Sequence, residues 1–290
     1  MIRLGFSVEL QYQVAPPGAD FIFNLQAAQT RQQRVLKERL DLSPAAVLQT
    51  HTDAVSRSRY LRLSARPGPL LLRSAAAVEL QHHVAQPSQI AEVPVRELPP
   101  HVLPYLNPSR YCESDRLGAL AMQHFGALRQ GYMRVAAIRD WVQQRLRFRM
   151  NSSDSTTSAC DTINNGVGVC RDFAHVMISL CRALNIPARF ATGFDYGADP
   201  ALGPPDFHAY VEAYLGHRWY LFDASGVAIP MAFVRLATSR DAGDAAFATI
   251  FGKVDSRTPT VRIDALPDDQ GMLRMPHYTT DALSTDDGQP

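Results

Sequence analysis

Five prolines within residues 94–108 divide this chain of 290 residues into two parts with different hydrophobic patterns. Proline lacks a backbone N–H and fixes φ, so this stretch can form neither a helix interior nor a central strand. Before it, apolar residues recur at alternate positions, whereas after it they recur every three or four positions. The length also exceeds that of a typical domain of about 100–150 residues. The sequence therefore predicts a linker between a strand-rich domain and a domain that contains helices.

Short runs of apolar residues fill the first part of the chain, and most of them alternate with polar residues. These runs cover residues 6–14, 21–25, 59–65 and 78–84. Alternation with a period of two is typical of a half-buried strand. Several short strands with turn residues between them predict an antiparallel β-sandwich. No cluster of candidate catalytic groups occurs here, so we interpret residues 1–105 as a folding or recognition domain.

The second part of the chain contains two predicted helices. The first carries apolar residues at helical spacing, at Val135, Ile138, Val142 and Leu146. A polar loop rich in Ser, Thr, Asn and Gly is predicted over residues 151–169. The second helix begins at Cys170. Its apolar stripe consists of Phe173, Val176, Met177, Leu180 and Leu184, and Pro187 stops it.

Strands are predicted after this helix, over residues 188–194 and as a hairpin with Gly216-His217 at its turn. The pattern indicates an α+β domain over residues 106–266, in which helices pack on an antiparallel sheet. The segment 267–290 is rich in Asp, Thr and Gly, and we expect it to be a mobile tail. The sequence does not decide whether the loop at 195–206 covers the site described below.

The charge and the cysteine pattern restrict the partners and the compartment. Lys and Arg total 29 and Asp and Glu 28, so a net charge of +1 gives no general attraction to nucleic acid or acidic membranes. No apolar run approaches the ~18 residues of a membrane span, and the first residues lack the apolar core of a signal peptide. The four cysteines form no Cys-x-x-Cys pair, and a core of this size needs no disulfides. We expect a cytoplasmic protein.

Cys170 is the first candidate for chemistry because glycines at 166 and 168 precede it and it opens a helix. The field at a helix N-terminus favours thiolate, which is the nucleophilic form, and free N–H groups there can receive an oxyanion. The alternative is a core cysteine, and the two interpretations are about equally balanced. For Cys112 and Cys181 we favour the core interpretation.

His208 is the candidate base because of its place in the predicted hairpin. If Leu215 opposes Arg218, then His208 is the diagonal neighbour of Asp223 on the same face, at roughly 7–8 Å between Cα atoms. A carboxylate at this distance can orient the imidazole and support the imidazolium. His175 lies closer to Cys170 in sequence, but five residues rotate it by about 140° around the helix. We expect it to face solvent or a local hydrogen bond.

Three motifs carry these residues: GVCRDFAH at 168–175, DFHAYVE at 206–212 and WYLFDA at 219–224. As a set they resemble the transglutaminase-like superfamily, and more narrowly its bacterial branch of transglutaminase-like cysteine proteases. Residues 108–112 (PSRYC) and 246–252 (AFATIFG) are also similar to this family, so the resemblance extends over most of the chain. It implies a papain-like α+β catalytic core behind an N-terminal β-sandwich.

The resemblance assigns the nucleophile, base and orienting acid to Cys170, His208 and Asp223, the same residues that the spacing brings together. It implies acyl transfer at a peptide or glutamine amide through a thioester, which water resolves in a hydrolase. Two alternatives stay open. An amine could resolve the thioester, as in a protein-glutamine amine transferase, or the chain is a catalytically silent scaffold. The expected partner is a peptide or protein substrate, and the oligomeric state does not follow from the sequence.

Other motifs are incomplete or absent. The Gly166-x-Gly168 pair begins like a dinucleotide fingerprint, but Arg171 stands where the third glycine belongs. The sequence has no Asp-x-Asp-x-Asp-Gly calcium loop, no Walker loop and no His-Glu-x-x-His, so we expect neither metal nor cofactor. Asn164, six residues before Cys170, is a candidate for the second oxyanion donor, although an Asn in a polar loop is more often a turn residue.

Overall fold

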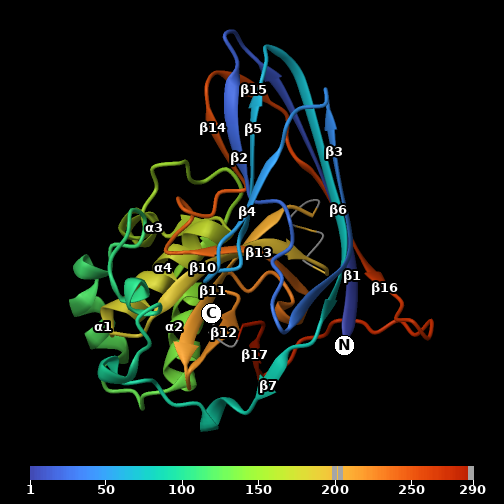
Figure 1. The fold of residues 1–290 in the computed structure, drawn as a ribbon. Helices are drawn as coiled ribbons and strands as arrows, with labels where there is room; N and C mark the ends of the chain where they lie inside the picture. Colours follow the sequence, from blue (N-terminus) through green and yellow to red (C-terminus); the bar gives the residue numbers. More distant parts are fainter. Residues whose placement is uncertain (198–200, 202–204, 287–290) are drawn as a thin grey trace.

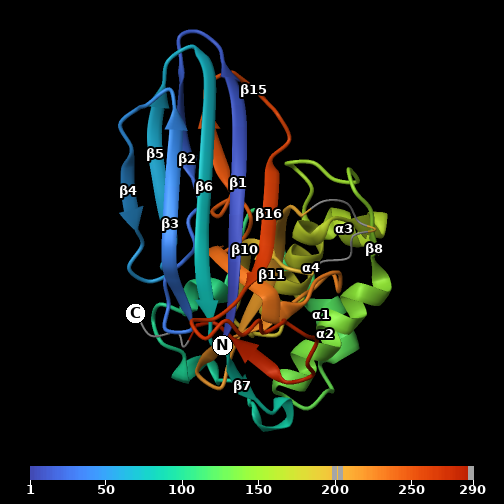
Figure 2. The ribbon, with the colours of Figure 1, turned by 90° about the vertical axis from the view of Figure 1, so that its right-hand side faces the viewer.

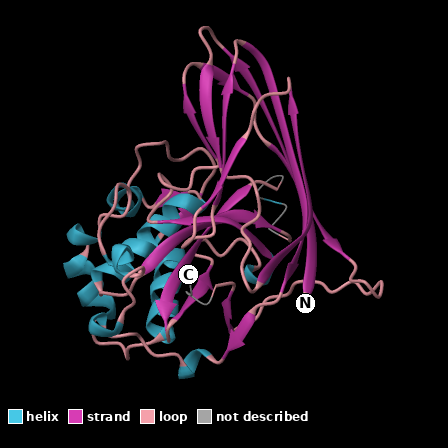
Figure 3. Ribbon diagram, viewed as in Figure 1, coloured by secondary structure: helices cyan, strands magenta, loops and turns pink. Residues whose placement is uncertain are grey.

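The computed structural model describes residues 1–197, 201 and 205–286. Within these residues, a β-sandwich lies beside a third antiparallel sheet that is covered by helices, as the sequence predicted (Figure 1). Helices gather on one side of the molecule and the long strands on the other (Figure 3). The helices are α1 (Gly118–Phe125), α2 (Tyr132–Arg145), α3 (Ala159–Asn165) and α4 (Cys170–Ala183).

Two sheets form the sandwich. The first contains β1 (Ile2–Val14), β3 (Gln33–Ser43), β6 (Gly68–Leu80), β15 (Val254–Ser256) and β16 (Thr260–Leu266). The second contains β2 (Ala19–Phe23), β4 (Gln49–Thr52), β5 (Arg59–Ala65) and β14 (Ala248–Phe251). Alternate residues of β1, such as Phe6 and Leu10, enter the shared core beside Phe21 and Phe23 of β2. The period-two pattern therefore marks the faces that the two sheets bury against each other.

Strands from the end of the chain complete this sandwich. β16 pairs with β1 from Arg3↔Leu266 to Glu9↔Thr260, and β14 pairs with β2. Figure 2 shows β16 beside β1, next to the long strands β6 and β3. Residues 248–266 were assigned to the helix-containing domain from the sequence, but their strands extend the sandwich sheets. Pairing between the two ends of a chain has no local sequence signal, so periodicity could not reveal it.

The third sheet has the order β12-β11-β10-β13, and nearly all of its residues are buried, so both of its faces are covered. Its strands are β10 (Ala188–Asp195), β11 (Phe207–Leu215), β12 (Arg218–Phe222) and β13 (Phe233–Ser239). On one face, Val211 and Ala213 of β11 share a core with Phe173 and Met177 of α4. Other residues of the sheet, including Val234 of β13, join the sandwich core. The sheet therefore connects the helices to the sandwich.

The hairpin register agrees with the prediction. Leu215 pairs with Arg218 and Val211 with Phe222, and Gly216 and His217 form the turn. Both turn residues have positive φ, at 53° and 61°, as a type I′ turn requires. This register places Asp223 directly after the last residue of β12, next to the neighbouring strand β11 that carries His208.

The structure differs from the sequence-based expectation in the polar loop at 151–169. α3 lies within that loop, and Ser158 and Asp161 cap its first turn reciprocally. The residues of β9 (Val167–Gly168) then pair in parallel with β8 (Arg147–Phe148). The capping pair was visible in the sequence, but a seven-residue helix is too short to show an apolar period.

The segment expected to be a mobile tail is attached to the third sheet at residues 282–286. β17 (Ala282–Ser284) pairs with β7 (His83–Ala85). The buried carboxylate of Asp286 then forms ion pairs with Arg189 at 2.5 Å and with Arg235 at 2.9 Å. A polar composition indicated mobility, but here Asp286 forms buried ion pairs and Ser284 and Thr285 form hydrogen bonds.

The proline-rich stretch forms neither α-helix nor long strand, as predicted, and contains two 3-10 turns at Val95–Glu97 and Leu103–Leu106. Among the described residues, the longest α-helices have 14 residues, and none is long and apolar enough to cross a membrane.

Gly193 is required where β10 passes β13. A Cβ built on it would lie 1.9 Å from the carbonyl oxygen of Val234 and 2.6 Å from the ring of Phe233. We expect Gly193→Ala to lower the free energy of unfolding by about 3 kcal/mol or more, at the upper end of overpacking effects. Urea unfolding measures this loss. Gly118→Ala is the matched control, because its Cβ would meet no atom within 4 Å, and equal stabilities for the two variants would contradict the packing described.

Candidate active site

The site begins where α4 starts. Cys170 is the first helical residue, and the Asp172 carboxylate caps the helix by accepting a hydrogen bond from Val169 N–H at 2.9 Å. Gly168 permits this turn, because a Cβ there would lie 2.8 Å from Cβ of Asp172. The N–H groups of Cys170 and Arg171 lie in the first turn, where no preceding carbonyl of the helix can accept them. The sulfur therefore lies beside donors that could receive a developing oxyanion.

The structure brings the three predicted residues together. Nε2 of His208 lies 3.4 Å from Oδ1 of Asp223. The Cys170 side chain is among the groups that raise the pKa of the His208 imidazole, so it belongs to the surroundings of the ring. The imidazole thus has a thiol and a carboxylate as neighbours, the set of groups in which a base can take a thiol proton while an acid orients it.

The environment of His208 stabilises its charged form. Burial disfavours the imidazolium. The Asp195 carboxylate and the side chains of Cys170 and Asp223 outweigh this effect and raise the pKa of the imidazole well above its ordinary value of 6.5. This shift favours the imidazolium, the form that can donate a proton to a leaving group.

Asp223 is held rigidly and remains ionised. Its Oδ1 accepts hydrogen bonds from the backbone N–H of Ser225 at 2.9 Å and from the Ser225 hydroxyl at 2.7 Å, and its Oδ2 accepts from Ala228 N–H at 3.0 Å. Burial favours the neutral acid, but the hydrogen bond and charge of His208 and these donors lower the pKa of the carboxyl below its usual 3.8. The side chain can therefore orient the imidazole without taking its proton.

A second carboxylate, which the sequence analysis missed, also faces the histidine. Asp195 ends β10, and its Oδ2 lies 3.6 Å from Nδ1 of His208. Its Oδ1 accepts a hydrogen bond from the Tyr210 hydroxyl at 2.7 Å. Because β10 and β11 are joined by a long loop, no turn rule gives their register from the sequence. The available signal was only that an acid follows the apolar strand at 188–194.

The remaining cysteines are core residues, as predicted for two of them. Cys112, Cys160 and Cys181 are buried and Cys170 is half-buried, and all four are free thiols. Burial raises the pKa of Cys112 and of Cys181 to about 12, which makes both poor nucleophiles at neutral pH. Cys170 therefore has the exposure that a reactive thiol needs.

The expectation for His175 is wrong. The ring is completely buried rather than facing solvent. It stacks on Tyr111 and accepts a hydrogen bond from Ala242 N–H at 3.2 Å, a partner 67 residues away in the sequence rather than a local one. Burial lowers the pKa of this imidazole to about 3, so it is neutral and has a structural role.

Asn164 is exposed near the end of α3 and makes no side-chain hydrogen bond within the described part of the chain. Its assignment as an oxyanion donor stays a prediction. Residues 198–200 and 202–204 of the loop at 195–206 lie outside the described residues.

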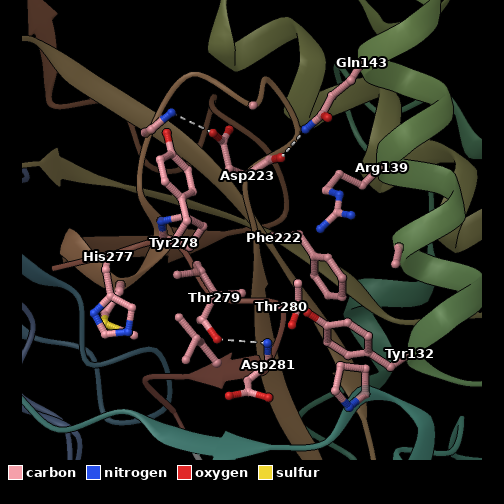
Figure 4. A pocket seen from close by; sticks show the side chains of 18 of the residues that line it. Tyr132, Arg139, Gln143, Phe222, Asp223, His277, Tyr278, Thr279, Thr280 and Asp281 are labelled. Carbon is pink, nitrogen blue, oxygen red and sulfur yellow. Dashed lines mark hydrogen bonds between the residues drawn. The ribbon is translucent and has the colours of Figure 1, made fainter. Parts of the chain in front are cut away.

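A cavity of about 560 Å³ lies next to Asp223 (Figure 4). Arg139 and Gln143 of α2 extend into it, and Tyr278 of the C-terminal segment lies on the opposite side, near the Asp223 carboxylate. Gln143 donates a hydrogen bond to the backbone carbonyl of Asp223 at 3.0 Å. Neither Cys170 nor His208 is among the described residues that line the cavity. It therefore borders the orienting acid and does not lie over the thiol.

Comparison with known proteins places this arrangement in a family. Residues 119–224 match the family model of the transglutaminase-like superfamily, and residues 3–101 match that of the bacterial transglutaminase N-terminal domain. The crystal structure of a candidate cysteine protease from Cytophaga hutchinsonii is 38% identical, with a TM-score of 0.89, and the match covers 98% of this chain and 97% of that one. The chain belongs to the transglutaminase-like superfamily.

More distant similarities are shorter or weaker. An uncharacterized protein of Mycobacterium leprae is 28% identical over 116 residues, which are 39% of this chain and 41% of the relative's length. The periplasmic domain of TgpA from Pseudomonas aeruginosa is 18% identical, with a TM-score of 0.39 over 79% of this chain and 92% of that one.

Proposed function

We propose that this chain hydrolyses a peptide or amide bond through a thioester on Cys170. The observation that carries the proposal is the position of His208, whose Nε2 lies 3.4 Å from a carboxylate oxygen of Asp223 and whose pKa is raised by the Cys170 side chain. Thiol, imidazole and carboxylate in this order are the parts that cysteine-dependent acyl transfer needs.

The proposed reaction has two halves. In the first, the Cys170 sulfur attacks the amide carbon, and the oxyanion is held by the N–H groups at the start of α4. The C–N bond breaks, and His208 gives its proton to the departing amine or ammonia. In the second half, His208 takes a proton from water, the resulting hydroxide attacks the thioester, and the C–S bond breaks to release an acid. Asp223 keeps the imidazole oriented in both halves.

Water is proposed as the acyl acceptor because the relative that matches over almost the full chain is described as a candidate cysteine protease. The same three residues would also serve an amine acceptor, so the product must be measured. We propose a peptide or protein as the substrate class.

The test is a product analysis with casein as the substrate and dansylcadaverine as a competing amine. New amino termini or free ammonia, with little fluorescence in the protein, are the expected result. Dominant incorporation of the fluorescent amine would assign the amine-transfer alternative. No product of any kind, together with a Cys170 that alkylating reagents do not modify, would support a silent scaffold.

A further inference from the structure

Asp195 is a buried carboxylate that the proposed reaction does not yet use. It is 5% exposed, and His208 and Asp223 are similarly buried, at 8% and 4%. The Tyr210 hydroxyl fixes its Oδ1, and this contact turns Oδ2 towards Nδ1 of His208 at 3.6 Å. Within the described residues Oδ2 has no hydrogen-bond partner.

Leaving a buried carboxylate oxygen without a hydrogen-bond partner costs stability, so the presence of Asp195 at this position needs an explanation. The surroundings of Asp195 contain no Lys or Arg ion pair among the described residues, and the group of opposite charge that faces it is the protonated His208. Asp223 occupies the other ring nitrogen. The imidazole therefore lies between two carboxylates, one at each nitrogen.

We propose that Asp195 is a positioning residue that holds His208 in its imidazolium form, together with Asp223, when Cys170 carries no negative charge. This inference rests on the proposed function. Asp195 acts through His208 and does not touch the substrate.

The need for a second carboxylate follows from the charges along the reaction. Before attack, the Cys170 thiolate balances the imidazolium. Once the sulfur has formed the thioester, that negative charge is gone, and His208 must become positive again as it takes a proton from water. The Asp195 carboxylate, 3.6 Å from Nδ1 of His208, supplies the missing balance. Asp195 should therefore contribute most to the second half of the reaction.

The charged groups around the ring are consistent with this role. Asp195 is the last residue of β10, and Cys170 is the first residue of α4. Asp223 directly follows β12. Tyr210 lies on β11, and Asp206 directly precedes that strand. Burial raises the pKa of Asp195 to about 6, although His208 and Tyr210 oppose the rise. The side chain is therefore mostly a carboxylate at pH 7 and can act as the anion proposed.

The experiment measures the titration of His208 in the full chain by ¹⁵N NMR of histidine-labelled protein, with His208→Gln to assign the signal. Removing a nearby negative charge lowers the pKa of an imidazole, so in Asp195→Asn its midpoint should fall by about one pH unit or more. A second readout is the pH dependence of Cys170 carboxymethylation by iodoacetate. The imidazolium attracts this anion, so the alkaline decrease in rate should shift to lower pH by a similar amount.

Asp206→Asn is the matched control, because it makes the same chemical change at an exposed carboxylate that His208 also senses. Asp206 is not among the groups that chiefly set the pKa of His208, so in this variant the His208 midpoint should move by only about 0.3 units or less. Equal midpoints in the wild type and Asp195→Asn, with unfolding temperatures also equal, would overturn the inference. If Cys170 of the wild type is not selectively carboxymethylated, the proposed function itself fails, whatever Asp195 does.

Discussion

Replacing Cys170 with serine is expected to reduce the turnover of an amide substrate by about 10⁴-fold or more. The hydroxyl occupies almost the same volume, but it loses its proton far less readily than a thiol and forms an ester in place of a thioester. Because Cys170 is only half-buried at the start of α4, the fold should be preserved, with a change in unfolding free energy within about 0.5 kcal/mol. Initial rates per folded molecule, together with urea unfolding, measure both effects.

Cys181→Ala provides the comparison for this variant. Cys181 lies on the same helix but is completely buried in the core. Its truncation should therefore reduce stability by about 1 kcal/mol or more and leave the activity of the folded protein close to that of the wild type. If the cysteine-to-serine variant at 170 kept a tenth of the activity, Cys170 would not be the nucleophile.

His208→Gln is expected to lower kcat/KM by about 10³-fold, within the usual range for losing a general acid–base. Glutamine can still hydrogen-bond to Asp223, but it can neither accept the thiol proton nor donate one to the leaving amine. The exposed His217→Asn in the turn of the same hairpin is the control, since asparagine tolerates its positive φ. Similar kcat/KM values for the two variants would contradict the role of His208.

Asp195 should also change how stability depends on pH. It has a folded-state pKa of about 6, raised above its ordinary 3.8, so its ionisation costs stability as pH rises through this interval. Asp195→Asn removes this cost, so the stability of the variant relative to the wild type should be higher at pH 8 than at pH 5, which urea unfolding at both values would measure. The same difference between the two proteins at both pH values would mean that the pKa of Asp195 is not raised in the folded state.

Local features of the site could be predicted from the sequence because they depend on neighbouring residues. The glycines before Cys170 and the apolar stripe after it indicate the start of α4, and the Gly216-His217 turn sets the register that brings His208 beside Asp223. Each of these conclusions needs only contacts within one helix or one hairpin.

Features that depend on distant contacts could not be predicted in this way. The approach of Asp195 to His208 requires the register of β10 against β11 across a long loop. β3 carries mostly exposed residues at the outside of its sheet, so its sequence lacks the alternation that revealed β1. The pairing of β16 with β1 joins residues from opposite ends of the chain. In each case the physical signal lies in tertiary contacts that no short window contains.

The central claim is that the Cys170 sulfur is activated by His208. The most direct test is to treat the folded protein with limiting iodoacetamide at pH 6 and to map the modified cysteines by mass spectrometry, because the thiolate is the reactive form. We expect Cys170 to be modified at least about tenfold faster than the three buried cysteines, and we expect His208→Gln to abolish this preference. Preferential modification of Cys112 or Cys181 while Cys170 stays inert would contradict the assignment.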